Sequence, residues 1–251
     1  MKRGRIIDIS NCCVHITQRC HDGGFLLKFE IDRKNYIKRL GETVRRFNIA
    51  VLDYMITCNH VHLLLHSDDI NKISAAMQYL QGLTARDYNR RKGRSGSFWS
   101  DRFNPTLVEN GVHLSRCLYY IGLNMVRAGV VAHPQDWTAS GYDEITGQRQ
   151  RYRILNLPAL LESLGMPRRI TDFRTWYRRT VDQMSLSNNL YREEHWTNAV
   201  AVGSKAWLES IADILSEADK SFERVQNLRN DIIKEGGGTY ALNAKNGVLN
   251  R

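Results

Sequence analysis

The chain has 251 residues, of which 42% are hydrophobic, enough for one large domain or for one domain with an extension. Its 36 Lys and Arg outnumber its 26 Asp and Glu, a net charge of +10 that favours an anionic partner, nucleic acid before a membrane surface. A basic solvated surface without a specific partner is the alternative. Because no apolar run approaches the ~18 residues of a membrane span and no secretion signal is recognisable, we expect a cytoplasmic, nucleoid-associated protein without membrane contact.

The five cysteines are odd in number and form no C-x-x-C pair, so we expect reduced thiols in the cytosol. Several of them lie near the start of the chain together with two histidines: Cys12, Cys13, His15, Cys20 and His21. Their spacing matches no standard zinc pattern. A strand with small buried thiols is therefore the preferred interpretation.

Strand and helix patterns alternate along the first 110 residues. They predict a strand over 12–18, a helix over 32–47 with Asp32 as its N-cap, strands over 49–56 and 60–66, a helix over 70–91 after capping residues at 67–69, and a last strand over 106–108. This β-α-β-β-α-β order favours an α+β fold of the ferredoxin-like or RRM-like type, an antiparallel sheet with helices on one face.

Two histidines follow a predicted tight turn at Cys58-Asn59. His60 and His62 are two residues apart in a strand, so their imidazoles lie side by side on one face, while Val61 and the alternating leucines face the opposite layer. Two neutral imidazoles at this spacing provide half of a divalent-metal site. The pair can equally consist of half-buried polar residues without a ligand.

The segment 86–103 contains six basic and two acidic residues, interleaved with aromatic rings. Cations neutralise phosphates and rings stack on bases, so this composition suits single-stranded nucleic acid. The alternative is a solvated helix end whose aromatic residues enter the core. Together with two arginines outside the segment, the predicted DNA-binding residues are Arg19, Arg86, Arg90, Arg91, Lys92, Arg94, Trp99, Arg102 and Arg127.

A helix is predicted over 113–130, and it carries a second set of polar groups. Tyr120 and Asn124 are four residues apart and therefore neighbours on one helix face. The tyrosine could attack a phosphorus that a metal polarises, and the amide could be a third ligand beside the two histidines. Read alone, Tyr119-Tyr120 is an ordinary core residue with a half-exposed neighbour.

The remaining sequence divides the chain into a domain over 1–147, a helical extension over 148–235 and a flexible polar tail over 236–251. Helices are predicted over 158–164, 168–179, 196–215 and 216–234. The segment 168–179 holds five arginines and one aspartate. It suits either a nucleic-acid-facing helix or a packed helix with an Arg-rich outer face.

Five stretches in chain order resemble the REP-associated tyrosine transposases, the single-tyrosine branch of the HUH nucleases. They are Val14-His15-Ile16-Thr17-Gln18-Arg19, Asn59-His60-Val61-His62-Leu63-Leu64-Leu65, Ser97-Phe98-Trp99 with Arg102-Phe103, Tyr120-Ile121-Gly122-Leu123-Asn124-Met125-Val126-Arg127-Ala128-Gly129-Val130-Val131, and Asp136-Trp137-Thr138-Ala139-Ser140. The resemblance covers about residues 10 to 145. The chain departs from the family pattern at Cys58 and Met125, where the family usually has proline, and at Gly122, where it often has glutamate.

The resemblance implies an HUH catalytic domain in which His60, His62 and Asn124 hold Mg²⁺ or Mn²⁺. It also implies that Tyr120 attacks single-stranded DNA, leaving a 5′-phosphotyrosine and a free 3′-OH. The expected function is cleavage and rejoining of single-stranded DNA at hairpin-forming repeats, by a monomer or a homodimer. A non-catalytic nucleic-acid-binding module on the same fold and a hydrolytic metal nuclease are the competing hypotheses.

Overall fold

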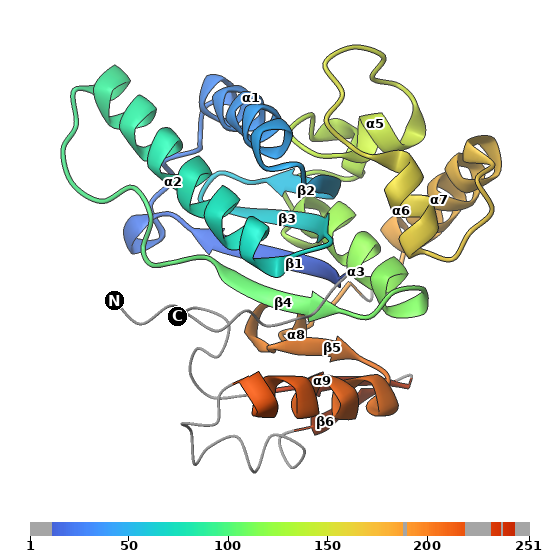
Figure 1. Ribbon diagram of the computed structural model, residues 1–251. Helices are drawn as coiled ribbons and strands as arrows, with labels where there is room; N and C mark the ends of the chain where they lie inside the picture. Colours follow the sequence, from blue (N-terminus) through green and yellow to red (C-terminus); the bar gives the residue numbers. More distant parts are fainter. Residues whose placement is uncertain (1–11, 188–189, 219–231, 237, 244–251) are drawn as a thin grey trace.

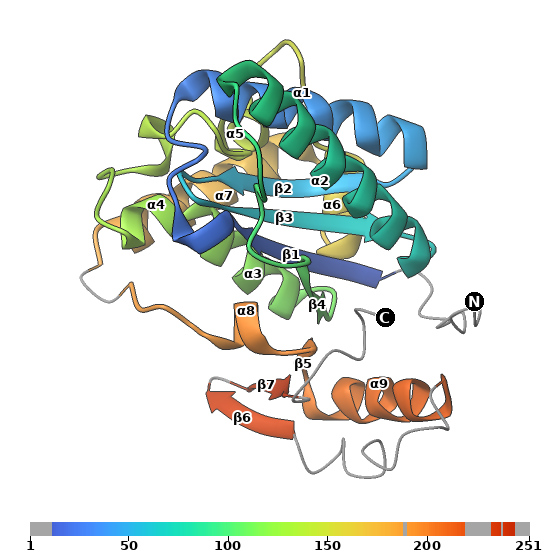
Figure 2. The same cartoon turned by 90° about the vertical axis from the view of Figure 1, so that its left-hand side faces the viewer.

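The computed structural model describes residues 12–187, 190–218, 232–236 and 238–243 (Figure 1). The first part of the chain forms β1 (Cys12–Arg19), the short 3₁₀ helix η1 (His21–Gly23), α1 (Glu30–Phe47), β2 (Ala50–Ile56), β3 (His60–Ser67), α2 (Ile70–Lys92) and β4 (Asn104–Val108). The strands pair antiparallel in the order β2-β3-β1-β4, and α1 and α2 lie side by side on one face (Figures 1 and 2). The predicted ferredoxin-like α+β fold is confirmed.

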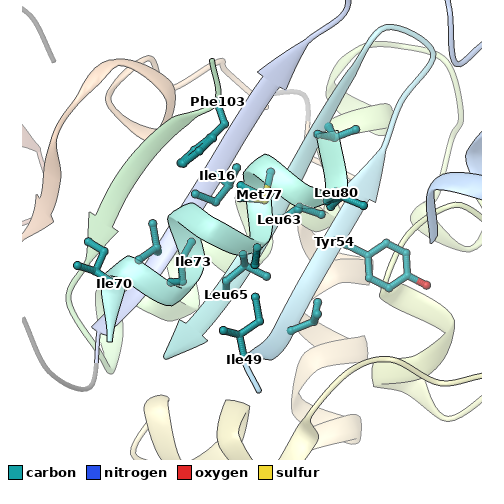
Figure 3. Close-up of a cluster of buried hydrophobic side chains, with 14 of the residues drawn as sticks. Ile16, Ile49, Tyr54, Leu63, Leu65, Ile70, Ile73, Met77, Leu80 and Phe103 are labelled. Atoms are coloured by element: carbon teal, nitrogen blue, oxygen red, sulfur yellow. The ribbon is translucent and has the colours of Figure 1, made fainter. Parts of the chain in front are cut away.

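Side chains along the central strands point alternately to the two faces of the sheet, and those on the face under α1 and α2 form the first core. Leu63 and Leu65 of β3 point toward α2, whose Ile73 and Met77 cover them (Figure 3). All four side chains are buried. Each buried side chain of this size contributes about 1.5–3 kcal/mol relative to an exposed one, so this layer holds α2 on the sheet.

A second core covers the other face of the sheet, for which the sequence analysis predicted no helices. Five helices and a 3₁₀ turn follow β4: α3 (Val112–Gly122), α4 (Asn124–Arg127), η2 (Pro134–Asp136), α5 (Tyr142–Thr146), α6 (Leu157–Ser163) and α7 (Ile170–Ser185). Leu64 of β3 and Leu52 of β2 pack here with Leu118 of α3 and Tyr177 of α7. The expectation of helices on one face is therefore corrected, because α3 and the helices after it shield the opposite face.

The C-terminal part continues the same sheet. After α8 (His195–Asn198), β5 (Ala201–Gly203) pairs parallel to β4, and α9 (Lys205–Ala218), β6 (Ile232–Gly236) and β7 (Thr239–Leu242) follow. The sheet order becomes β2-β3-β1-β4-β5-β7-β6, and Figures 1 and 2 show this addition beyond the β4 edge. The domain boundary at residue 147 stays a prediction.

The prediction of a purely helical extension over 148–235 is wrong, because that range contains β5 and most of β6. β5 interrupts the helix expected over 196–215, and most of the helix expected over 216–234 lies outside the described residues. The predicted tail over 236–251 includes β7, whose Ala241 and Leu242 are fully buried. The three-residue strand β5 has too few residues for periodicity to reveal it, so only its pairing with β4 and β7 defines it.

Two helix ends also differ from expectation. α1 begins after Phe29, and Asp32 is a buried residue inside the helix instead of its N-cap. The single helix predicted over 113–130 is divided at Leu123 into α3 and α4. α2 begins as predicted, with the Asp69 side chain accepting a hydrogen bond from the backbone N–H of Asn71 at 2.8 Å. Among the described residues, no helix combines the length and apolar character needed to cross a bilayer.

Gly122 has a packing role that explains its place at the end of α3. A Cβ atom here would lie 2.7 Å from the hydroxyl oxygen of Tyr177, a fully buried side chain with little room to move. We expect Gly122→Ala to destabilise the protein by about 1–2 kcal/mol, because overpacking outweighs the helix propensity of alanine. Urea unfolding measures the change.

Gly82, in the middle of α2, is the matched control, because a Cβ atom added there would meet nothing within 4 Å. There Gly→Ala should raise the free energy of unfolding by about 0.5–1 kcal/mol. Equal stabilisation by both substitutions would contradict the packing role of Gly122.

Candidate active site

The strand β3 and its neighbour β1 position the two histidines. His60 pairs with Arg19 and His62 pairs with Thr17 in the antiparallel register. Residues opposite each other in such a pair point to the same face, here the face covered by α3. The ring centroids of His60 and His62 are 5.0 Å apart, so the predicted side-by-side arrangement is confirmed.

The turn before β3 orients the His60 ring. Its Nδ1 lies 2.8 Å from Oδ1 of Asn59 and 2.9 Å from Oγ1 of Thr57. The Asn59 amide nitrogen donates to the carbonyl of Gly23, so its oxygen is the atom that accepts from His60. His60 therefore carries its proton on Nδ1 when neutral, which leaves Nε2 for a further ligand.

His62 lies deeper, and both of its ring nitrogens have partners. Nδ1 lies 2.9 Å from Nε2 of His15, and Nε2 lies 3.1 Å from the amide nitrogen of Asn124. The Nδ1 of His15 lies 2.8 Å from the main-chain oxygen of Trp196. β1, β3, α4 and α8 thus meet around one imidazole.

Burial keeps these imidazoles uncharged. It lowers the pKa of His60 to about 4, with Arg19, Arg192 and Arg127 adding repulsion. It also lowers the pKa of His62 well below the usual value, with further contributions from His15 and His60. Imidazoles ligate metals only when neutral, so both rings are in the competent form at neutral pH.

Tyr120 of α3 lies across from the histidines. Its ring is 5% exposed and its centroid is 6.0 Å from that of His62. The guanidinium of Arg127 lies 4.1 Å from the ring centroid and donates to the Tyr120 carbonyl at 3.2 Å. Burial raises the pKa of Tyr120, while Arg127 and Arg192 favour its ionised form and offset part of this rise.

The neighbouring Tyr119 faces α7 within the second core. It stacks on Tyr177 with ring centroids 5.8 Å apart and contacts Trp176. Burial raises its pKa to about 12. The two tyrosines thus point to different environments, and only Tyr120 meets the histidines.

A pocket of about 550 Å³ opens above these residues. His60, His62, Tyr120 and Asn124 all line it, so the structure brings together the four residues that the sequence analysis selected. Arginines from four separate parts of the chain also line it: Arg19, Arg102, Arg127 and Arg192. Cations in a concave site attract phosphate groups and strengthen their binding.

The sequence analysis missed Arg192, Asn104 and His15. Arg192 and Asn104 line the pocket, and His15 lies behind His62. The period of two along β1 places His15 and Thr17 on the face of Arg19, a signal that could have found His15. No local pattern indicates Arg192, because only the fold brings residues after α7 to this pocket.

Residues 8–124 match the family model described as "Transposase IS200 like". Over these residues the chain is similar to the IS200-like transposases. The family prediction from the motifs is confirmed at this level, and the matched stretch contains the two histidines, Tyr120 and Asn124.

Among solved structures, the chain is similar to that of a REP-associated tyrosine transposase bound to a REP hairpin, with 19% identity and a TM-score of 0.47. The alignment covers 61% of this chain and 90% of that one. No curated protein matches the chain.

The donor groups of this pocket suit a divalent cation. Among the residues the structure describes, no three His, Cys, Asp or Glu side chains are grouped to hold a metal ion. The Asn124 amide, which lies beside His62, is the candidate for a third protein ligand next to the two histidines. This neutral set of two nitrogens and one amide fills half of a six-coordinate shell, leaving places for water and phosphate oxygens.

Apart from Arg102, which lines the pocket, the predicted DNA-binding residues of α2 and the following loop lie outside it, and three of them have structural contacts. Trp99 is 8% exposed, donates to the Gln81 carbonyl and packs on Tyr36, so its ring belongs to the core. Arg94 hydrogen-bonds to Asn89 and to the Ser97 carbonyl. Arg91 forms an ion pair with the buried Asp32. The predicted base-stacking role of Trp99 is thereby corrected, since a ring enclosed in the core cannot stack on a base.

The other cations of this segment are exposed. Arg86, Arg90 and Lys92 lie at the surface of the C-terminal half of α2. Lys92 lies 4.8 Å from the ring centroid of Phe29, an exposed aromatic residue. Their contact with DNA stays a prediction.

Arg91→Ala tests the division between structural and surface cations. It leaves the Asp32 carboxylate buried without its cation. We expect a loss of about 1–3 kcal/mol in the free energy of unfolding, less than for a fully enclosed pair because part of Arg91 is exposed. Urea unfolding measures it.

Arg90→Ala is the control, because the Arg90 side chain is 78% exposed. Its loss should be at most about 0.5 kcal/mol. Similar stability of the two variants would mean that the Arg91 ion pair does not hold α1 against α2.

Proposed function

We propose that this protein cuts and rejoins single-stranded DNA by transesterification, with Tyr120 as the nucleophile. The observation that carries the proposal is the convergence of Tyr120, Asn124, His60 and His62 in one arginine-lined pocket. These residues come from β3, α3 and α4, which pack together only in the folded chain. A tyrosine beside two neutral imidazoles and an amide suits phosphoryl transfer to the phenol oxygen.

The chemistry of the step follows from the residues. The Tyr120 oxygen attacks a backbone phosphorus, a new P–O bond forms, and the bond to the 3′ oxygen breaks. The phenol proton leaves, the departing 3′ oxygen takes up a proton, and the 5′ phosphate stays on the tyrosine. The reverse attack by a 3′-OH rejoins the strand without ATP, because the phosphotyrosine conserves the ester bond.

The residues around Tyr120 favour loss of its proton. Arg127 lies against the ring, and Arg192 lines the same pocket. Both cations stabilise a phenolate and bind phosphate oxygens. A divalent ion held by His60, His62 and Asn124 would polarise the scissile phosphate and offset charge in the transition state.

We propose single-stranded DNA with hairpin-forming repeats as the substrate, on the strength of the motif resemblance. Pocket arginines supply backbone affinity that is independent of base sequence. The enzyme would act in the cytoplasm on nucleoid DNA, as a monomer or a homodimer. A non-catalytic DNA-binding module would bind the same strands without reacting with them.

Tyr120→Phe should abolish covalent adduct formation and leave DNA binding within a few-fold. The substitution removes the attacking oxygen and keeps the ring that packs on Arg127. Incubation with hairpin-bearing single strands and Mn²⁺, followed by denaturing electrophoresis, measures the adduct, and sequencing the trapped strands identifies the substrate.

Tyr119→Phe is the matched control and should retain the adduct, since its ring packs in the second core. An adduct formed by Tyr120→Phe but lost in Tyr119→Phe would reverse the assignment. Cleavage without any adduct in the wild type would indicate a hydrolytic nuclease instead.

His60→Ala and His62→Ala should each abolish cleavage at any Mn²⁺ concentration, because each removes one of two imidazole ligands. His66→Ala, on the same strand beyond the pocket, should cleave like the wild type. Cleavage of a labelled oligonucleotide across a Mn²⁺ titration gives the comparison. Undiminished wild-type cleavage in excess chelator would exclude the metal role and leave the histidines as structural residues.

A further inference from the structure

We propose that His15, held by the main-chain carbonyl of Trp196, is a positioning residue that fixes the tautomer of His62. This inference rests on the proposed function, since it assigns a role to His15 behind the same metal site. It also gives the C-terminal part of the chain a place in that site.

The first link in the chain of hydrogen bonds is His15 to Trp196. His15 lies in β1, is 0% exposed, and places Nδ1 2.8 Å from the Trp196 oxygen. A carbonyl oxygen only accepts hydrogen bonds, so Nδ1 of His15 carries the hydrogen. A fully enclosed imidazole that contacts a carbonyl and a second imidazole stays neutral, because an unpaired buried charge is costly. Its Nε2 therefore has a lone pair and no hydrogen.

The tautomer of His15 determines the tautomer of His62 through the hydrogen bond between the two rings. The bare Nε2 of His15 lies 2.9 Å from Nδ1 of His62, so His62 donates from Nδ1. Its own single hydrogen is then used, and its Nε2 presents a lone pair. The amide nitrogen of Asn124 lies 3.1 Å from Nε2 of His62 and donates to it. Each group in the series Asn124, His62, His15 and the Trp196 carbonyl therefore donates to the next one. His62 thus keeps its lone pair on Nε2, where a metal ion would replace the N–H of Asn124.

The geometry also restrains the ring itself. The imidazoles of His15 and His62 stack with centroids 5.1 Å apart and planes within 10°. A second partner that fixes the other nitrogen of a metal-binding histidine sets both the tautomer and the ring orientation, and its loss typically weakens metal affinity about 10–100-fold.

The Trp196 carbonyl belongs to the C-terminal segment, and two side chains of β4 hold that segment in place. Oγ1 of Thr106 donates to the Ala199 carbonyl at 2.7 Å, and the Asn104 amide donates to the Thr197 carbonyl. Both donors lie on β4, where Thr106 pairs with His15 across the strands. Trp196 also packs its ring near Tyr120, with centroids 6.1 Å apart.

The C-terminal partners in these contacts, Trp196, Thr197 and Ala199, lie outside residues 8–124, the stretch that matches the transposase family model. The segment around α8 therefore supplies the outer layer of a site whose inner residues all belong to the matched stretch. On this inference the catalytic domain alone lacks the acceptor that sets the His62 tautomer.

The test uses full-length, metal-free protein with ¹⁵N-labelled histidine. Long-range ¹H–¹⁵N spectra distinguish an imidazole protonated on Nδ1 from one protonated on Nε2, and His62→Ala identifies the His62 signals. In the wild type, His62 should be protonated on Nδ1. In His15→Phe, which keeps a ring but removes both nitrogens, it should become a mixture of tautomers.

Mn²⁺ binding, followed by electron paramagnetic resonance of the free ion, gives the second readout. His15→Phe should weaken Mn²⁺ binding about 10–100-fold. His15→Gln, whose amide oxygen can accept from His62, should recover most of it. His66→Phe replaces another histidine with a ring and should change neither readout, and circular dichroism verifies that each variant is folded.

The outcomes separate this inference from the proposed function. A wild-type His62 protonated on Nε2 overturns the inference, as does a folded His15→Phe with unchanged tautomer and Mn²⁺ affinity. If His15→Phe fails to fold, the wild-type spectrum and His15→Gln decide it. If the wild type binds no Mn²⁺ at all, the proposed metal role fails, while the imidazole spectra still decide the tautomer.

Discussion

The alternation of side chains along β3 is the constraint on which the rest of the structure depends. One face of this strand carries Leu63 and Leu65, which hold α1 and α2 through the first core. The other face carries His60 and His62 at one end and Leu64 farther along, within the second core. A shift of one residue in register would exchange these faces, turning the histidines toward the first core and leucines toward the pocket. The register that places the leucines of β3 in the first core therefore also places its histidines in the pocket.

The second core gives the site its electrostatic character. By covering the face that carries the histidines, α3 and α8 bury His62 and the Tyr120 phenol and leave His60 half-buried. Burial disfavours the charged form of each group, which suits the histidines as ligands and opposes ionisation of the tyrosine. The arginines around the pocket act in the opposite direction on Tyr120, since they favour the phenolate. The same cations repel a proton from His60, so one set of charges serves both roles.

The C-terminal part is joined to the site by backbone hydrogen bonds. β5 extends the sheet from β4, and the segment before it brings the Trp196 carbonyl to His15 and Arg192 to the pocket. Every residue has a main-chain carbonyl, so a sequence motif cannot indicate which carbonyl accepts the hydrogen bond from His15. The strands β5, β6 and β7 escaped prediction for a related reason, because short strands are defined by their partners more than by their composition.

The sequence by itself determined the βαββαβ order and the face of β3 that carries the histidines, because each follows from a local period of two or of 3.6 residues. The selection of Tyr120 with Asn124 rested on their spacing together with the motif resemblance. The sequence also indicated the transposase family through motifs in register. Only the tertiary structure decided that Trp99 is a core residue, that Arg91 pairs with Asp32, and that Arg192 reaches the pocket. Those outcomes depend on contacts between residues far apart in the chain, and local periodicity holds no information about which distant partner a side chain meets.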